Sequence, residues 1–309
     1  MKILVTGGAG FIGSHIIERW HTRAEVRVLD NLRSGFRENL HGLRHEFFHG
    51  SILDRALVRR AVDGVDFVFH LAAMVSVPES VENPADCREL NTDGTRLVLE
   101  EAARAGVKKL VFSSSAAIYG DHPATPKVES MTPEPKSPYA VTKLDGEILC
   151  REFTAEKNLP TACLRYFNVF GPRQYARSQY AAAVPIFIAR ALRHEPLAIH
   201  GDGGQTRDFI HVHDIAAANE FFAAQSPATG VFNLAHGQGL SIRQLADDIR
   251  ALAGSRSEIV HDPERAGDVR HSLADVGKIR AAGFAPQENF ADGLRATVEF
   301  FRAKQRAQS

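Results

Sequence analysis

Short apolar runs alternate with amphipathic segments along the first half of the chain. The apolar runs have the length of strands, and the segments between them carry apolar residues at helical spacing, which is typical of a parallel sheet covered on both faces. The pattern predicts strands at residues 2–5, 25–29, 46–48, 66–70, 108–113 and 160–165. It predicts helices at residues 11–20, 54–62, 84–105 and 138–157.

The alternation of apolar runs and amphipathic segments becomes irregular after Arg165. The pattern predicts further strands at 208–212 and 231–234, and helices at 184–193, from Asp214 onward and at 241–252, with Ser241 as an N-cap. A polar tail closes the chain, and we find no internal repeat. The second half is therefore expected to be a smaller lobe interleaved with the last elements of the sheet.

Composition and charge narrow the class of protein. The chain has 309 residues, of which 44% are hydrophobic and 24% are charged, as in an ordinary globular protein with a full core. Lys and Arg number 37, as do Asp and Glu, so the formal net charge is zero. Because no excess positive charge exists to displace counterions, binding of nucleic acid by bulk electrostatics is disfavoured.

Cysteine usage and apolar run lengths bear on the compartment. The three cysteines, Cys87, Cys150 and Cys163, form no CxxC pair, and an odd count without a framework fits a reducing compartment. The N-terminal apolar run, residues 3–5, is too short for the core of a signal peptide, and no run has the length of a membrane span. We expect a cytoplasmic protein without a membrane partner.

A glycine-rich turn follows the first predicted strand. Gly7, Gly10 and Gly13 lie within the segment TGGAGFIG and precede a predicted helix. Glycine lets the backbone turn tightly and lets a pyrophosphate approach, and the helix N-terminus then offers unpaired N–H groups. A plain structural turn is the alternative, but the strand–turn–helix context favours a dinucleotide site.

An acidic residue ends the second predicted strand. The carboxylate of Asp30 is placed to accept both ribose hydroxyls of adenosine and would repel a 2′-phosphate, which favours NAD over NADP. Arg33 lies close by and would soften that preference. The alternative is that Asp30 only caps a turn with Asn31.

A candidate catalytic group lies on the helix predicted at 138–157. Tyr139 and Lys143 are four residues apart and so share a helix face. We expect the ammonium to lower the pKa of the phenol, which would let Tyr139 act as a general base on a hydroxyl. YxxxK alone is common by chance, and a surface tyrosine beside a solvated lysine is the alternative. Ser113, Ser114 and Ser115 end the preceding strand, where open parallel sheets bind ligands, and this favours catalysis.

These motifs together resemble the extended short-chain dehydrogenase/reductases of the NAD-dependent epimerase/dehydratase family, which act on nucleotide sugars. The matching segments are TGGAGFIG, Asp30–Asn31, HLAA at 70–73, SSSAAIYG at 113–120, YAVTK at 139–143, RYFNVFGPRQ at 165–174, GDGGQTRDFIHVHDIA at 201–216 and RAGDVRHSLAD at 265–275. Within the family, the chain is most similar to the UDP-glucose 4-epimerases and their N-acetylhexosamine relatives.

The resemblance implies an α/β fold with a Rossmann-type doubly wound parallel sheet and a smaller C-terminal substrate lobe. Residues 1–166, with 208–236 returning to them, would form the NAD-binding domain, and 167–309 would form the interleaved nucleotide-sugar lobe. The implied NAD-binding residues are Gly7, Gly10, Phe11, Ile12, Gly13, Asp30, Asn31, Ser34, Gly35, Ser51, Ile52, Leu71, Ala72, Ala73, Asn91, Ser113, Tyr139, Lys143 and Tyr166. Ser51 stands where the family usually has an aspartate that contacts adenine.

The resemblance also implies a substrate site in the second half. Asn168 and Arg207 would hold the diphosphate, an anion that suits an Arg fork. Arg265 would meet phosphate, and Asp268 would take a ribose hydroxyl. Val184, Ala198 and His200 would border the uracil, and Ser115 would contact the sugar. Each arginine taken singly is more often a solvated surface residue.

The residues after the serines bear on the reaction. Dehydratase and decarboxylase relatives carry acidic residues directly after the catalytic hydroxyl, whereas Ala116 and Ala117 follow Ser115 here and transfer no proton. The resemblance therefore implies NAD-dependent 4-epimerisation of UDP-hexoses through a transient 4-keto intermediate, with Ser115, Tyr139 and Lys143 as catalytic residues. The alternatives are UDP-N-acetylglucosamine as the main substrate, a nucleotide-sugar reductase, and a non-catalytic NAD-binding protein.

Three further expectations concern specificity, metal and assembly. Ser272 occupies a family position beside the sugar 2-substituent, and its small side chain would leave room for an N-acetyl group; an incidental loop serine is the alternative. His211 and His213 lack a third metal ligand by spacing, so we expect no metal site. The resemblance implies a homodimer formed through a four-helix bundle of the helices predicted at 84–105 and 138–157.

Overall fold

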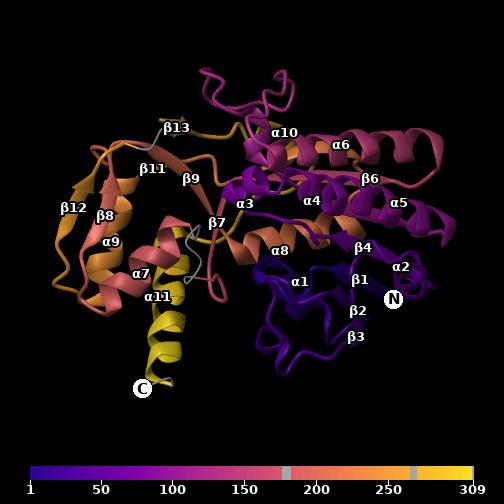
Figure 1. The fold of residues 1–309 in the computed structure, drawn as a ribbon, viewed down its shortest axis with the longest axis horizontal. Helices are drawn as coiled ribbons and strands as arrows, with labels where there is room; N and C mark the ends of the chain where they lie inside the picture. The colour runs from indigo at the N-terminus through magenta and orange to yellow at the C-terminus, as the bar shows by residue number, and fades with distance from the viewer. Residues whose placement is uncertain (176–181, 265–269, 308–309) are drawn as a thin grey trace.

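The apolar runs assemble into one large parallel sheet (Figure 1). The computed structural model describes residues 1–175, 182–264 and 270–307, and within this part the large sheet has seven strands. In spatial order they are β10 (Gly230–Leu234), β6 (Thr161–Tyr166), β5 (Lys109–Ser115), β4 (Phe67–His70), β1 (Lys2–Thr6), β2 (Glu25–Asp30) and β3 (Glu46–His49). Neighbouring strands are parallel throughout, and the order reverses between β1 and β4. This is the predicted doubly wound sheet.

Helices cover both faces of the sheet because successive side chains of a strand point to opposite sides. Ile3 and Val5 of β1 pack in one core cluster with residues of α1 (Phe11–Trp20) and α8 (Val212–Glu220). Leu4, between them, packs in a second cluster with residues of α2 (Arg55–Val62), α5 (Gly94–Arg104) and α6 (Pro138–Glu156). A strand buried on both faces has no polar stripe, which explains its continuous apolar run.

The long helix predicted at 84–105 is broken into three parts. α4 (Pro84–Arg88) leads into a π-helical turn, η2 (Glu89–Asp93), and then into α5. A short helix, α3 (Val77–Glu82), precedes them and was not predicted; the Ser76 hydroxyl caps it. The remaining short helical turns are η1 (Arg37–Leu40), η3 (Ala116–Tyr119) and η4 (Phe221–Gln225).

The smaller lobe stands beside the large sheet and holds the C-terminal helix (Figure 1). One sheet contains β11 (Gly239–Ser241), β9 (Thr206–His211), β13 (His271–Ser272) and β7 (Asn168–Phe170), and a second pairs β12 (Ile259–Asp262) with β8 (Leu197–His200). The helices are α7 (Ala183–Leu192), α9 (Ile242–Ala253) and α11 (Phe290–Arg306), whereas α10 (Gly277–Ala281) packs against β10, and its Ile279 belongs to a core cluster of the large sheet. A third core cluster joins α7, α9 and α11 through Ile188, Leu245 and Leu294.

The pattern analysis missed several elements of this lobe. It assigned no helix to residues 290–306, which form α11, because this helix is mostly polar and buries few apolar side chains, among them Leu294 and Val298. It extended the strand at 208–212 too far: β9 ends at His211, whose ring accepts a hydrogen bond from the backbone N–H of His213 and so caps α8. In the described part of the chain, we find no helix that is both long and apolar enough to cross a membrane.

Candidate active site

The glycine-rich turn after β1 is packed against the segment that follows β4. Gly7 has a left-handed backbone conformation, with a φ of 69°, and a Cβ there would lie 2.8 Å from the backbone N of Ala72. A Cβ on Gly13 would lie 2.4 Å from the carbonyl oxygen of Gly7. Since real Cβ atoms do not come this close, glycine is required at both positions, and α1 begins directly behind the turn.

The N-terminus of α1 is open for an anion. Gly10 is its N-cap, and no side chain in the described residues caps the first turn, which contains Phe11, Ile12 and Gly13. Unpaired N–H groups and the helix dipole together favour a phosphate there. The structure thus brings the five residues predicted for pyrophosphate binding into one turn that fits the group.

Asp30 ends β2 and faces the same turn. Its Oδ2 accepts a hydrogen bond from the backbone N–H of Ala9 at 3.0 Å, and its Oδ1 accepts one from Leu32 at 2.7 Å. Burial raises the pKa of this carboxyl group above its ordinary value. Asp30 therefore caps the turn after β2, as the alternative interpretation held, and each carboxylate oxygen keeps a lone pair for the predicted ribose hydroxyls.

The segment after Asp30 is shaped by contacts within the protein. Asn31 is exposed and accepts a hydrogen bond from the backbone of Arg33, and Ser34 is exposed beside it. Gly35 packs against the glycine turn, where a Cβ would lie 2.9 Å from the backbone of Ala9. The guanidinium of Arg33 pairs with Glu79 at 2.7 Å, so it is held toward α3 and its charge is partly neutralised.

The segment after β4 is fixed by a buried hydroxyl and a buried histidine. The Oγ1 of Thr6 accepts hydrogen bonds from the backbone N–H groups of Leu71 and Ala72, each at 3.2 Å. It also lies 2.7 Å from Nδ1 of His70, whose Nε2 lies 2.9 Å from Oγ1 of Thr95. Burial lowers the pKa of His70 to about 3, so this histidine is neutral and structural. It holds Leu71, Ala72 and Ala73 at the carboxyl edge of the sheet.

Asn91 holds the segment after β4 by hydrogen bonds to its backbone. Its Oδ1 accepts a hydrogen bond from the backbone N–H of Met74 at 2.7 Å, and its Nδ2 donates to the Met74 carbonyl at 2.9 Å and to Thr142 at 3.0 Å. The residue is buried. Asn91 therefore ties the segment after β4 to α6, the helix that carries the candidate base.

Ser51 and Ile52 lie in the turn after β3. The Ser51 hydroxyl accepts a hydrogen bond from the backbone N–H of Leu53 at 3.2 Å and remains half-buried. The Ile52 side chain is buried under α5, where a Cβ on Gly94 would lie 2.6 Å from its Cδ1. Any contact of Ile52 with adenine must therefore come from its backbone.

The candidate catalytic residues converge from β5 and α6. Ser137 caps α6 by accepting a hydrogen bond from the backbone of Ala140, and the Ser80 hydroxyl accepts one from the backbone N–H of Tyr139. These contacts set the first turn of the helix. Ser115 ends β5 close enough to Tyr139 to act on the pKa of the phenol, so the two side chains are neighbours at this edge.

The electrostatics of the site differ from expectation. Burial raises the pKa of Tyr139, with the Ser115 hydrogen bond acting in the opposite direction. Burial also lowers the pKa of Lys143 to about 8. The predicted lowering of the Tyr139 pKa by the lysine is therefore wrong for the protein alone, because desolvation of the phenolate is the largest contribution and the direction of the shift is upward.

Tyr166 ends β6 directly beside Ser115 of β5 in the strand register. Its hydroxyl accepts hydrogen bonds from Oγ of Ser113 at 3.0 Å and from Nδ2 of Asn219 at 2.8 Å. Burial raises the pKa of Tyr166 to about 12, so it stays neutral. The ends of β1, β2, β4, β5 and β6 thus contribute predicted site residues to one edge of the sheet.

The predicted diphosphate ligands come from adjacent strands of the smaller lobe. Asn168 of β7 lies opposite Phe209 of β9, and its Nδ2 donates to the Asp208 carbonyl at 3.0 Å. Arg207 of β9 is half-buried and lies opposite Ser272 of β13 in the register. The structure therefore brings together Asn168, Arg207 and Ser272, which are far apart in sequence.

The predicted uracil neighbours lie deeper in this lobe. Val184 is buried on α7, whereas Ala198 and His200 are half-buried on β8. Nδ1 of His200 lies 3.3 Å from the carbonyl oxygen of Pro263. The other two predicted substrate ligands, Arg265 and Asp268, lie outside the described residues.

Sequence reasoning missed four supporting side chains. Thr6, Ser80 and Asn219 place the residues described above, and Glu147 holds Ser114. Ser80, Asn219 and Glu147 belong to no quoted motif, whereas Thr6 opens TGGAGFIG but had been given no role; each acts through a partner that is distant in sequence. Only the fold identifies them.

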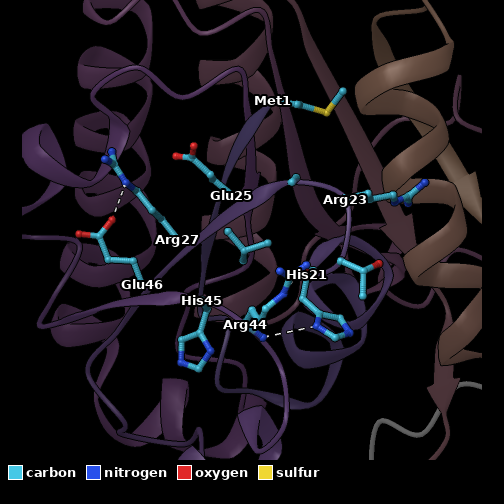
Figure 2. A pocket seen from close by; sticks show the side chains of 11 residues that line it. Met1, His21, Arg23, Glu25, Arg27, Arg44, His45 and Glu46 are labelled. Atoms are coloured by element: carbon cyan, nitrogen blue, oxygen red, sulfur yellow. Dashed lines mark hydrogen bonds and ion pairs between the residues drawn. The ribbon is translucent and has the colours of Figure 1, made fainter.

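A separate hollow opens at the opposite, amino end of the sheet (Figure 2). It has a volume of about 580 Å³ and is lined by Met1, residues 21–27 and residues 44–46. Its arginines are engaged within the protein: Arg27 pairs with Glu46 at 3.0 Å, Arg44 donates to the carbonyl of His21, and Arg23 pairs with Glu220. Because the strands begin there, this hollow is apart from the candidate site.

Known proteins match nearly the whole chain. The family model described as "NAD dependent epimerase/dehydratase family" matches residues 3–235. A UDP-glucose 4-epimerase of Mycolicibacterium smegmatis is 38% identical over 314 residues, covering 98% of this chain and 99% of the relative.

Two solved structures are similar in fold and sequence. A UDP-N-acetylglucosamine 4-epimerase from Methanobrevibacter ruminantium M1, in complex with UDP-N-acetylmuramic acid, has a TM-score of 0.95, 40% identity and coverage of 98% of both chains. A UDP-glucose 4-epimerase with UDP-glucose from Thermotoga maritima has a TM-score of 0.94, 40% identity and coverage of 99% and 100%.

Relatives named for other reactions match as well, among them a decarboxylase and a 4,6-dehydratase of sugar nucleotides. The matches establish the family and its cofactor, NAD. They do not distinguish between the reactions of its members, which depend on the residues of the site. The chain belongs to the NAD-dependent epimerase/dehydratase family.

Proposed function

We propose that this protein is a UDP-hexose 4-epimerase that interconverts UDP-glucose and UDP-galactose. The observation that carries the proposal is the meeting of Tyr139 and Lys143 of α6 with the end of β5, where Lys143 donates to the Ser113 carbonyl at 2.7 Å and no acidic residue directly follows Ser115. A hydroxyl pair moves one proton to and from a sugar hydroxyl, whereas elimination of water needs a further acid and base.

The roles of the residues follow from their places. Tyr139 accepts the proton of the sugar 4-hydroxyl, and Ser115 bridges the two oxygens. A bound NAD would supply the hydride acceptor for C4 and the donor for its return, so that the reaction would pass through a 4-keto sugar with no net oxidation. Lys143 places a positive charge beneath the phenol, with Nζ 5.8 Å from the centre of the Tyr139 ring.

Retention of the nucleotide is assigned to the smaller lobe. The keto sugar must present its other face before the hydride returns, so the diphosphate has to stay bound while the sugar turns. Asn168 and Arg207 lie on the neighbouring strands β7 and β9 and suit this task, with Arg265 and Asp268 as further proposed ligands.

A second candidate substrate is UDP-N-acetylglucosamine. Ser272 lies opposite Arg207, and its short side chain leaves more space than a tyrosine would. The similar protein from M. ruminantium is named for this substrate. We therefore propose that the pocket admits both plain and N-acetylated hexoses.

Two further parts of the proposal concern assembly and cofactor. The exposed apolar side chains Val141 and Ile148 on α6 support a homodimer through α5 and α6. The open N-terminus of α1 and the carboxylate of Asp30 support tightly held NAD.

We also propose that the protein acts in the cytoplasm.

The deciding experiment follows UDP-galactose by NMR with purified protein and no added cofactor or acceptor. We expect it to equilibrate with UDP-glucose. Tyr139→Phe and Ser115→Ala should slow the reaction by about 10²–10⁴-fold, the range for loss of a proton-transfer group. Tyr175→Phe, at an exposed tyrosine stacked on Phe36, is the matched control and should retain the rate.

Other outcomes would decide for the alternatives. Steady consumption of added NADH with one equivalent of sugar product would identify a reductase. Bound NAD with no turnover of any UDP-hexose would identify a non-catalytic binding protein.

A further inference from the structure

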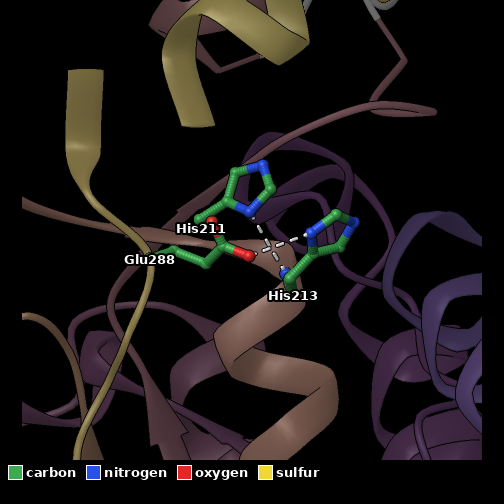
Figure 3. A group of neighbouring side chains, drawn as sticks. All are labelled: His211, His213 and Glu288. Carbon is green, nitrogen blue, oxygen red and sulfur yellow. Dashed lines mark hydrogen bonds and ion pairs between the residues drawn. The ribbon is translucent and has the colours of Figure 1, made fainter. Parts of the chain in front are cut away.

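Three metal-ligating side chains from distant parts of the chain meet where β9 ends (Figure 3). His211 is the last residue of β9, His213 lies in the first turn of α8, and Glu288 lies shortly before α11. One ligand atom from each residue lies within 4.8 Å of the others. The sequence offered no third ligand near the two histidines. In the fold, Glu288, which lies 75 residues after His213, takes that place.

One pair of ligand atoms already has the separation that a metal ion needs. Zinc binds nitrogen and oxygen at about 2.0–2.2 Å, so two ligand atoms at the tetrahedral angle lie roughly 3.4 Å apart. Nδ1 of His213 and Oε1 of Glu288 are 3.2 Å apart. Their side chains are 47% and 37% exposed, so both can rotate to close the wider distance to His211.

The position of Glu288 is set by a neighbouring carboxylate. Oδ1 of Asp214 accepts a hydrogen bond from the backbone N–H of Gln287 at 2.8 Å, and its Oδ2 accepts one from Glu288 at 3.2 Å. Asp214 follows His213 directly in sequence. The segment that carries the third ligand is thus tied to the helix that carries the second.

The position of His211 is set by packing. Its ring lies against Gly293 of α11, where a Cβ would be 2.9 Å from Cδ2, and its centroid is 5.3 Å from that of Phe170. These contacts hold the imidazole in place at the end of β9.

A cation in the neighbourhood of this cluster, Arg173, is already paired with a carboxylate. Arg173 contacts His15, whose ring centroid is 5.3 Å from that of His213, and the same guanidinium pairs with Glu18. The local charge therefore includes the carboxylates of Glu288 and Asp214 as well as the Arg173–Glu18 pair, and it does not exclude a divalent ion.

We propose that His211, His213 and Glu288 bind one divalent transition-metal ion of the zinc class, with a fourth position open to water. Two imidazoles and a carboxylate are a donor set that such ions favour. The bound ion would join the end of β9 to the segment before α11 and so stabilise the smaller lobe.

The test titrates Co²⁺, a spectroscopic substitute for Zn²⁺, into the full chain without an affinity tag and with its cofactor retained. We expect saturation at one ion per chain with visible d–d absorption, and a Zn²⁺-dependent rise in Tm. His213→Gln and Glu288→Gln should each weaken binding by at least about 10–100-fold, the usual cost of losing even an outer partner. His41→Gln, at an exposed histidine outside the cluster, is the control and should bind as wild type does.

Two results would overturn the proposal. One is wild-type protein that shows no saturable Co²⁺ band. The other is Co²⁺ affinity that is equal in wild type, His213→Gln and Glu288→Gln, since the ion would then bind elsewhere. Neither readout uses turnover of a sugar nucleotide, so the outcome is independent of the proposed epimerase activity.

Discussion

The ammonium of Lys143 donates a hydrogen bond to the carbonyl oxygen of Ser113 at 2.7 Å. This contact anchors a charge on α6 to the end of β5, the strand that also carries Ser115. The lysine is 5% exposed, and burial lowers its pKa to about 8 from an ordinary 10.5. The charge beneath Tyr139 is therefore kept at a cost in folding free energy.

The first prediction concerns that cost. Between about pH 8 and pH 9.5, folded Lys143 loses its proton while the unfolded chain keeps one, so stability from this group rises with pH. Wild type should gain up to about 2 kcal/mol of unfolding free energy relative to Lys143→Met over this interval, at about 1.4 kcal/mol per pH unit. Urea titrations at several pH values measure the difference. Lys157→Met, at an exposed lysine, is the control for the loss of any lysine. If the unfolding free energy of wild type and Lys143→Met changed with pH in parallel, the prediction would be contradicted.

Cofactor choice should depend on Asp30. Asp30→Asn preserves the shape and one acceptor for the backbone groups of Ala9 and Leu32 but removes the charge that repels a 2′-phosphate. We expect the ratio of NAD to NADP affinity to fall by about tenfold or more, since hydrogen bonds to a charged group contribute roughly 1.5–3 kcal/mol. Calorimetric titration with each nucleotide gives the ratio. An unchanged ratio would show that Asp30 serves only as a turn cap.

Stability should depend on a buried ion pair between α6 and β6. Arg165 donates to Glu147 through Nε at 2.8 Å and through Nη2 at 2.7 Å, and Ser114 donates to the same carboxylate at 2.5 Å. Glu147→Gln leaves the guanidinium buried without its counter-charge, which typically costs about 3–5 kcal/mol. Denaturant unfolding measures the loss. Glu152→Gln, at an exposed glutamate on the same helix, should cost little, and equal effects of the two would refute the prediction.

Assembly should depend on the exposed face of α6. Val141 and Ile148 are seven residues apart, lie on the same helix face and are 43% and 37% exposed. Ile148→Lys should shift a homodimer toward monomer, because a charge would be buried in the interface. Light scattering across a dilution series measures the mass. Val260→Lys, at an exposed valine of β12, is the control; a wild-type protein that is monomeric throughout would contradict the dimer.

Substrate range should depend on Ser272. Ser272→Tyr fills space beside Arg207, so turnover of UDP-N-acetylglucosamine should fall by about tenfold or more relative to that of UDP-galactose. Initial rates for both substrates in both proteins measure the change. Equal loss of both activities would mean that the residue does not act as a size gate.

The sequence predicted the large sheet well because its strands are buried on both faces, as the apolar runs at Ile3–Val5 and Val68–Phe69 show. It also predicted which residues gather at the carboxyl edge, since parallel strands place their ends together. It did not predict β7, β8 or β12, which are short, or α11, whose buried face is narrow. Their existence depends on packing between segments that are distant along the chain.

Electrostatics was harder to predict than position. YxxxK correctly placed Lys143 near Tyr139, but the direction of the pKa shift depends on burial, which spacing does not reveal. Glu288 illustrates the same limit, because no pattern links it to His211 and His213. The assigned roles of Asn168, Arg207, Arg265 and Asp268 stay predictions, as does the domain division at residue 166.

The pairing of β10 with β6 has a practical consequence for anyone dividing the polypeptide. A fragment ending at residue 166 would finish on β6 and lose residues 230–234, which hydrogen-bond along it. In that fragment, β6 would be an edge strand with unpaired backbone N–H and C=O groups. Such an edge can pair with a strand of another molecule. The large sheet is thus completed by chain synthesised after residue 166, and we expect proteolysis between β6 and β10 to yield aggregates rather than a soluble fragment.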